Sequence, residues 1–477
     1  MTRTTYNGTR LIPHVVDEVS ATEPNRIVYS VALSADISKG FYEISARNFA
    51  NAVNKTAWWL QGLIGRSDKF ETIAYIKPHD IRYFLITLAC IKAGYKVLFL
   101  SPNNSKEGAA AIINATSCRL WVHPQGQPRD PLLEELRQEH DMHVLEMPEV
   151  EELLDADTVA HYSYTKNYDE AAAEPFCVLH SSGSTGLPKT ITITHGLVAT
   201  VDAVQLLPPT EGDHGFAPWT TYLEKGARMY SPNVLLHASA IIMNLLSTFF
   251  YGTHSIMGPV DVTPDMNLFE SLADHGEIDV WLVLPQYVNE LGQAPEILPK
   301  LRSSIVMAVA GGPVSPESAA EVNKFVRVFN LTGTTEGFLT GNLLVDQDDL
   351  LHFAFHPYSG FDFREVEPGV YEHWVVGTGQ KFPALLVELN DPEPSDDAVL
   401  EQLVAAVQKQ IQKADALSLY KGYLHNDCII FADRERPFVR TDKLTIKRQA
   451  TLNLYQQDIE KFYISRGDEA GWAVRAR

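Results

Sequence analysis

Apolar residues along this chain fall in short runs that alternate with stretches of helical spacing. The run at 72–76 has the composition of a buried strand, and apolar residues then recur at helical intervals over 81–93. A second strand at 95–100, a helix at 106–116 and a third strand at 118–123 repeat that order. Such β-α-β alternation predicts a parallel or mixed sheet covered by helices.

The same alternation returns after residue 190. It predicts a helix at 234–250, a strand at 254–257, a helix at 265–275, strands at 280–284 and 304–310, a helix at 317–324 and a strand at 326–331. Because the pattern occurs twice, we expect an α/β fold whose large N-terminal domain contains two similar sheet layers.

The composition changes near Glu367-Pro368-Gly369, where a smaller domain is expected to begin. Beyond this point the sequence predicts strands at 374–376, 384–387 and 428–431, an acidic linker at 390–397, and helices at about 398–414 and 446–463. We therefore predict a large N-terminal domain over 1–372 and a small α+β cap over 373–477.

Charge and apolar content limit the classes of partner. The chain has 477 residues, is 45% hydrophobic, and carries 60 acidic against 39 basic side chains, a formal net charge of −21. Such a surface repels nucleic acid and anionic membranes, so we expect neither as a partner. The longest apolar stretch, 234–251, contains His237, Asn244 and two serines, which predicts a buried core helix rather than a membrane span. Without an apolar leader or a cysteine framework, a soluble cytoplasmic protein is expected.

Candidate chemistry is concentrated in one loop. An apolar run at 176–179 is followed by a segment rich in glycine and hydroxyl groups, whose candidate ligand-binding residues are Ser181, Ser182, Gly183, Ser184, Thr185, Gly186 and Lys189. Glycines let backbone N–H groups approach an anion, hydroxyls add donors, and a lysine supplies a point charge suited to phosphates. A polar turn between two strands is the alternative, but so many donors ending in Pro-Lys favour phosphate binding.

This loop is not of the Walker A type. That motif requires a glycine directly before its lysine, and here Pro188 occupies the position. Proline has no N–H to offer a phosphate, so we expect a different kind of nucleotide loop.

The loop resembles the signature loop of the adenylate-forming superfamily, which includes acyl-CoA synthetases, luciferases and the adenylation domains of nonribosomal peptide synthetases. Further segments follow in the order of that family: 41–44 with Asn48, 92–102, His195, Gly311-Gly312-Pro313 and 332–337, where Thr332 replaces an aromatic residue. The segments 341–361 and 437–455 most resemble the adenylation domains of fungal carboxylate reductases and related synthetase-like enzymes.

The resemblance implies that ATP and a small carboxylic acid react to give an acyl-adenylate and pyrophosphate. It implies that Lys189 and the loop hold the triphosphate, that Thr335 bonds the α-phosphate with Thr334 as a further ATP-binding residue, and that Glu336 ligates Mg²⁺. The alternative for Glu336 is a solvated loop carboxylate.

Several further site residues are implied in the same way. Lys443 would bridge the substrate carboxylate and the α-phosphate, with Lys447 as a rival on the last helix. Gly311, Gly312 and Pro313 would border the adenine. The acyl pocket would draw on His237, Gly311, Thr332 and Gly333, although His237 could equally be a core histidine.

One expected segment is missing. After Val370-Tyr371-Glu372 the family continues for several dozen residues that carry a ribose-binding aspartate and a hinge, and neither motif is found here. A true deletion and an exon lost from a gene model both explain the gap. No carrier motif follows, so CoA or a separate carrier protein is the expected acceptor. The alternative functions are a catalytically impaired, nucleotide-binding or regulatory homologue and a standalone acyl-CoA ligase.

Overall fold

The computed structural model describes most of the N-terminal three quarters of the chain and parts of the remainder. The described residues are 8–182, 187–207, 210, 217–312, 314–338, 342–346, 350, 352–356, 385–387, 405, 409, 429–433, 435–440 and 448–465. They belong to two compact units, Met1–Phe361 and Asp362–Arg477.

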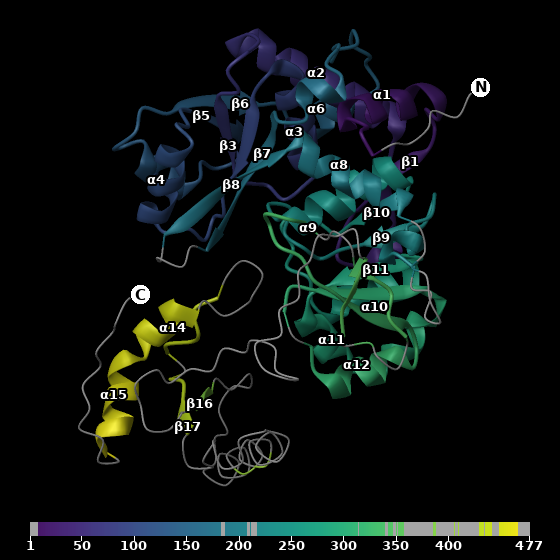
Figure 1. Ribbon diagram of the computed structural model, residues 1–477. Helices are drawn as coiled ribbons and strands as arrows, with labels where there is room; N and C mark the ends of the chain where they lie inside the picture. The colour runs from purple at the N-terminus through teal and green to yellow at the C-terminus, as the bar shows by residue number, and fades with distance from the viewer. Residues whose placement is uncertain are drawn as a thin grey trace. The chain divides into compact units, whose positions relative to one another are not determined.

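A six-stranded sheet occupies one half of the first unit (Figure 1). Its strands are β3 (Thr72–Tyr75), β4 (Lys96–Phe99), β5 (Leu120–Pro124), β6 (His143–Met147), β7 (Pro175–Ser182) and β8 (Pro188–Thr194), in the order β6-β5-β3-β4-β7-β8. All neighbours are parallel except β7 and β8, which form an antiparallel hairpin. Helices α3 (Arg82–Ala93) and α4 (Lys106–Ala115) connect parallel strands, as the alternation predicts.

A seven-stranded sheet forms the other half of this unit. Its strands are β1 (Ile27–Ala32), β2 (Phe41–Ser45), β9 (Arg228–Tyr230), β10 (His254–Met257), β11 (Val280–Val283), β12 (Val306–Ala310) and β13 (Arg327–Leu331), in the order β13-β12-β11-β9-β10-β1-β2. Only β2, at the edge, is antiparallel to its neighbour. Its helices include α10 (Met266–His275), α11 (Pro285–Leu291) and α12 (Pro316–Asn323). The predicted α/β fold with two sheet layers is therefore confirmed.

The apolar stretch at 234–251 forms a buried helix, as predicted, but it begins later than expected. It comprises α9 (Ala238–Ala240) and the π-helix η4 (Ile241–Tyr251), in which every residue from Ile241 to Phe250 is buried. His237 has extended backbone angles at the N-cap, so the helix cannot start at 234. No helix among the described residues is both long enough and apolar enough to cross a membrane.

The second unit has a small core of its own. Strand β16 (Leu385–Val387) pairs in parallel with β17 (Ile429–Phe431), which confirms two predicted strands. The single helix predicted over 446–463 is wrong: α14 (Arg448–Leu454) and α15 (Gln456–Ser465) are separated at Tyr455. The buried Tyr455 hydroxyl bonds to backbone groups of Asp433 and Arg436. The predicted strand at 374–376 and linker at 390–397 lie outside the described residues, as does almost all of the helix at 398–414.

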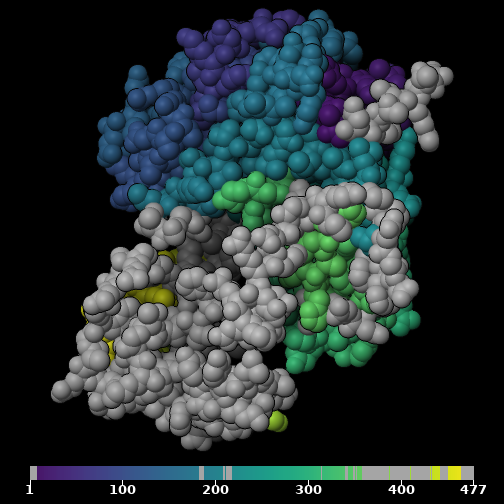
Figure 2. Space-filling model, in the orientation of Figure 1, coloured from purple at the N-terminus to yellow at the C-terminus, as the bar shows by residue number. Residues whose placement is uncertain are grey.

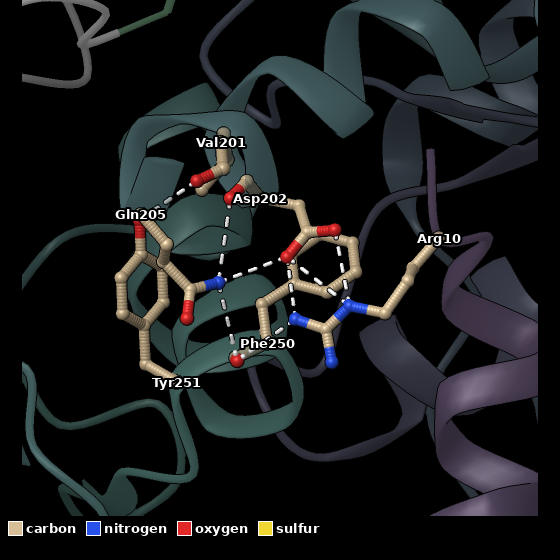
Figure 3. Close-up of polar contacts among 6 residues, drawn as sticks. All are labelled: Arg10, Val201, Asp202, Gln205, Phe250 and Tyr251. Atoms are coloured by element: carbon tan, nitrogen blue, oxygen red, sulfur yellow. Dashed lines mark hydrogen bonds and ion pairs between the residues drawn. The ribbon is translucent and has the colours of Figure 1, made fainter. Parts of the chain in front are cut away.

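A buried ion pair joins three distant segments of the first unit (Figure 3). The Arg10 guanidinium, just before α1 (Ile12–Thr22), donates to both carboxylate oxygens of Asp202 on α8 (His195–Ala203) and, at 3.1 Å, to the carbonyl of Phe250 on η4. The Gln205 amide donates to the same carboxylate at 2.8 Å. Because the Asp202 side chain is fully buried, this network fixes the start of α1 against α8 and η4.

Two histidines in this unit are held uncharged by burial. His195 begins α8 and is 2% exposed, with its ring beside those of Tyr164 and Phe176. Burial, helped by the nearby Lys166 charge, lowers the pKa of His195 to about 4. Burial and the Arg228 charge lower the pKa of His254, at the start of β10, to about 4. Folding therefore excludes a proton from each imidazole.

Removing one partner of the buried ion pair should destabilise the fold strongly. Arg10→Met leaves the Asp202 carboxylate buried without its guanidinium, which we expect to cost about 3–5 kcal/mol in the free energy of unfolding measured with urea. The double variant Arg10→Met/Asp202→Leu removes both charges and should be more stable than the single variant. Equal losses in both variants would contradict the importance of charge burial here.

The buried histidines should make stability fall in mild acid. The unfolded imidazoles take up protons below pH 6.5, whereas the folded ones resist until about pH 4, so each should cost up to roughly 3 kcal/mol across that window. His195→Leu should reduce the slope of urea stability against pH between 6.5 and 4.5 by about one proton. An unchanged slope would show that His195 does not contribute.

Candidate functional site

The phosphate-loop candidate lies at the turn of the β7–β8 hairpin. The two strands pair in register, with Ser181 opposite Lys189 and Ser182 opposite Pro188. A Walker A loop leads from a strand into a helix, whereas this loop leads into a second strand, which supports the assignment to another loop class. Gly183, Ser184, Thr185 and Gly186 lie outside the described residues, as does the side chain of Ser182.

The connection between β4 and α4 braces the base of this hairpin. The Ser101 backbone N–H donates to Nε2 of His180 at 3.1 Å, and the side chain of Asn104 lies 3.4 Å from the same nitrogen. Helix α4 approaches the end of the loop so closely that a Cβ on Gly108 would lie 3.3 Å from the ring of Pro188. The segment 92–102, singled out by resemblance, thus supports the loop through its backbone.

Two further candidate segments meet at the carboxyl edge of the seven-stranded sheet. Parallel strands β12 and β13 pair Ala310 with Leu331, so Gly311 and Thr332, the next residues along, leave the sheet side by side. This edge is where open α/β sheets bind ligands. Gly311 and Gly312 are exposed, and Pro313 lies outside the described residues.

Gly311 occupies a position that only glycine fits well. Its φ is +108°, and a Cβ would lie 3.2 Å from Cδ2 of Leu284. A side chain here would therefore strain the backbone and meet the end of β11. The absence of one leaves the carboxyl edge of the sheet open.

Residues 334–338 form a tight turn, which we call the acidic turn. The backbones of Thr334 and Phe338 exchange two hydrogen bonds, of 3.2 and 2.8 Å, and the Thr334 hydroxyl accepts from the Gly337 N–H at 2.9 Å. Phe338 is buried, whereas Glu336 at the tip is exposed. The turn therefore presents its carboxylate to solvent from a fixed base.

The acidic turn faces the hairpin of the other sheet. Nζ of Lys189 lies 3.9 Å from Oε1 of Glu336, and the two side chains are 67% and 52% exposed. In Figure 2 the green surface, from the part of the chain around 330–350, lies against the teal surface above it. Because both side chains are exposed, this ion pair contributes little to stability. Its charges are therefore available to a ligand.

Of the remaining predicted residues, three lie in the described part of the chain and two lie outside it. His237 lies half-buried in the segment between β9 and α9, and because β9 is parallel to β11 this segment leaves the sheet at the same edge as Gly311. Thr335 is half-buried within the acidic turn, and Gly333 is exposed. Lys443 and Lys447 lie outside the described residues. Among the described residues, no three histidine, cysteine, aspartate or glutamate side chains cluster as a metal site would require.

The sequence of this chain matches known protein families over most of its length. Residues 16–357, more than half of the chain, match the family described as AMP-binding enzyme, and residues 363–467 match the AMP-binding enzyme C-terminal domain. The chain belongs to the AMP-binding enzyme family. The resemblance to adenylate-forming enzymes is thereby confirmed.

Curated relatives of this AMP-binding enzyme include longer fungal proteins. It is 43% identical to the isocyanide synthase-NRPS hybrid crmA of Aspergillus fumigatus over 529 residues, which cover 97% of this chain and 34% of crmA. It is 25% identical to a carboxylic acid reductase of Neurospora crassa over 540 residues, covering 96% of this chain and 51% of the reductase. The chain thus spans about a third to a half of the length of these relatives.

Solved structures confirm the fold. The N-terminal domain of FACL13 from Mycobacterium tuberculosis superposes with a TM-score of 0.58 and 15% identity, covering 72% of this chain and 80% of that domain. The N-terminal subdomain of Klebsiella oxytoca NpsA superposes with a TM-score of 0.54 and 18% identity, covering 71% and 76%. At such identities the likeness concerns the fold alone.

Substitution of Gly311 should strain the carboxyl edge. We expect Gly311→Ala to lower the free energy of unfolding by about 1–3 kcal/mol, because alanine disfavours its positive φ and its Cβ meets Leu284. Gly62→Ala is the matched control: Gly62 lies in α2 (Ala46–Ile64) with open space around its Cα, so alanine there should stabilise by up to about 1 kcal/mol. Equal effects of the two variants would show that the backbone at Gly311 is unstrained.

Proposed function

We propose that this chain activates a carboxylic acid with ATP, forming an acyl-adenylate and releasing pyrophosphate. The observation that carries the proposal is the meeting of Lys189 with Glu336, a cation and an anion that two different sheets bring within 3.9 Å. Each is exposed; Lys189 lies on β8 opposite Ser181 of β7, and Glu336 lies at the tip of the acidic turn. Family membership also supports this reaction, because the chain matches the AMP-binding enzyme family and its C-terminal domain over most of its length.

The reaction joins two anions, so charge neutralisation and positioning are the main tasks of the protein. A carboxylate oxygen attacks the α-phosphorus, a new O–P bond forms, and the bond from that phosphorus to the pyrophosphate oxygen breaks. Lys189 neutralises the phosphates, with Ser181 to Thr185 as further donors. Thr335 bonds the α-phosphate, and Thr334 is a further ATP-binding residue. The overall charge of −21 makes such local neutralisation essential.

Mg²⁺ fits the donor set at the acidic turn. This cation is commonly held by one or two carboxylates together with substrate phosphates rather than by a dedicated protein cage. Glu336 is a single exposed carboxylate facing the phosphate-binding lysine, which is the arrangement that such shared coordination needs. Glu336 would hold the cation, which would supply further neutralisation of phosphate charge.

The carboxyl edge of the seven-stranded sheet is the proposed place of adenine and acid. Gly311, Gly312 and Pro313 would border the adenine, and His237, Gly311, Thr332 and Gly333 the acid. The positive φ of Gly311 supports this, because the missing side chain leaves the edge open. We assign the bridging role between the carboxylate and the α-phosphate to Lys443.

The relatives point to the kind of ligand and acceptor. The NpsA subdomain has been solved in complex with 3-hydroxybenzoyl-AMSN, and NpsA has also been solved as an artificial fusion of adenylation and PCP domains. By analogy we propose a small carboxylic acid as substrate and a thiol of CoA or of a separate carrier protein as acceptor. We further propose a role in fungal secondary metabolism, which the similarity to fungal proteins supports, and a cytoplasmic setting.

One observation favours a second candidate function. The alignment with crmA runs over 529 residues although this chain has only 477, so the relative contains a few dozen residues that have no counterpart here. That number agrees with the few dozen residues that the family resemblance predicts to be missing after Glu372. A chain without the ribose-binding aspartate and the hinge would bind nucleotide without turnover.

Exchange of pyrophosphate into ATP distinguishes the two candidates. We expect exchange that depends on Mg²⁺ and on an acid drawn from a broad panel, whereas the impaired homologue would bind ATP and show none. Lys189→Ala should abolish exchange and weaken ATP binding at least tenfold, or about 1.4 kcal/mol, because the phosphates lose their cation.

Lys324→Ala is the matched control for this experiment. Lys324 and Glu321 form a surface pair of similar exposure, 60% and 49%, on and next to α12. The control should exchange like the unmodified protein. Full activity of Lys189→Ala would refute the assignment of the loop.

A further inference from the structure

We infer that Asn342 is a positioning residue that orients the acidic turn, and through it Glu336, for the metal-bound nucleotide. This inference rests on the proposed function of Glu336, but the contact that carries it is independent of any ligand. Asn342 belongs to β14 (Asn342–Leu343) and is 1% exposed. It lies in the segment 341–361 that resembles the fungal relatives, but the sequence assigns it no role.

The Asn342 amide reproduces one rung of a β-ladder. Its Oδ1 accepts a hydrogen bond from the Thr332 backbone N–H at 3.1 Å, and its Nδ2 donates to the Thr332 carbonyl at 2.8 Å. An asparagine side chain has the same donor and acceptor as a peptide group, so it can hold both polar groups of one backbone residue. The contact fixes Thr332 in translation and in rotation.

Asn342 is itself anchored from the other side. Strand β14 pairs with β15 (Ala354–Phe355), where Asn342 lies opposite Phe355. The next residues attach to a segment far away in sequence: Leu343 forms a bridge with Pro218, and the Leu344 N–H donates to the Ala217 carbonyl at 2.8 Å. Leu343 and Leu344 are buried, so Asn342 is anchored independently of its contact with Thr332.

Thr332 is the point from which the acidic turn projects. It follows β13, and β13 is the terminal strand of the seven-stranded sheet. The turn closes on itself through Thr334 and Phe338, so its shape is set internally. Its direction depends on the two residues that lead into it, and the Asn342 contact fixes the first of them. The clamp therefore controls where the Glu336 tip lies relative to Lys189.

Direction matters because Mg²⁺ accepts little distortion. The cation requires near-octahedral oxygen ligands at about 2.0–2.1 Å, so a carboxylate that swings by an ångström no longer ligates it well. Misplacement of that size can cost as much as a hundredfold in rate. Loss of the clamp is thus expected to act on metal use before it acts on acid or adenine binding.

Three variants separate the clamp from general packing. Asn342→Ala removes both hydrogen bonds. Asn342→Asp keeps the shape and the acceptor but turns an oxygen toward the Thr332 carbonyl, so it should be at least as harmful. Asn323→Ala is the matched control, because the Asn323 Oδ1 accepts from the Val328 N–H at 2.8 Å and braces the opposite end of the same strand.

The first measurement is hydrogen–deuterium exchange of the ligand-free protein. Amides of 332–338 should exchange about tenfold faster in Asn342→Ala and Asn342→Asp than in the unmodified chain, and at the normal rate in Asn323→Ala. Unchanged exchange in the two Asn342 variants would overturn the inference. This result does not depend on whether the chain is active.

The second measurement uses Mg²⁺-dependent pyrophosphate exchange. Asn342→Ala should raise the Mg²⁺ concentration for half-maximal rate about tenfold, with little change in KM for the acid, while Asn323→Ala leaves both unchanged. In a Glu336→Gln background Asn342→Ala should cause no further loss, because it acts through Glu336. If the double variant loses activity by the product of the two single losses, the two residues act independently and the inference is refuted. If the unmodified chain shows no pyrophosphate exchange, the proposed function is refuted. The hydrogen–deuterium exchange result then decides by itself whether Asn342 orients the acidic turn.

Discussion

The carboxyl ends of parallel strands lie at one edge of a sheet, and this constraint organises the candidate site. In the seven-stranded sheet β12 and β13 run side by side, so the Gly311-Gly312 pair and the segment beginning at Thr332 must leave the sheet together. The six-stranded sheet ends its β7 strand in the serine- and glycine-rich loop. The proposed positions of the nucleotide and the acid depend on where the carboxyl ends of β7, β12 and β13 lie.

Charge in this molecule is managed locally. The net charge of −21 would repel a polyphosphate, yet Lys189 projects from a braced hairpin toward the acidic turn. Away from the site, charge is also neutralised locally, but in the interior of the first unit. There the buried Asp202 carboxylate accepts hydrogen bonds from Arg10 and Gln205. One pair is exposed and available to a ligand, whereas the other is buried and structural. Burial decides which role an ion pair takes.

Much of the fold could be predicted from local pattern. The strands and helices predicted over 72–123 and 254–331 lie within two residues of the observed bounds, because apolar periodicity reflects which face is buried. Strands β1, β2, β6, β8 and β9 were not predicted. The errors arise where a tertiary contact overrides that pattern. The last helix is divided at Tyr455, whose hydroxyl bonds to the loop around Asp433 and Arg436, and the long apolar helix starts only after His237.

The sequence by itself determined the chemistry of the loops: the hydroxyls, glycines and lysine of the 181–189 segment, the Thr-Thr-Glu of the acidic turn, and the α/β class. These are local properties, set by which atoms the neighbouring residues carry. Only the tertiary structure decided that Lys189 faces Glu336 and that Asn342 holds Thr332. Those contacts join residues from different strands or sheets, and their distances follow from how the sheets pack, which no short stretch of sequence encodes.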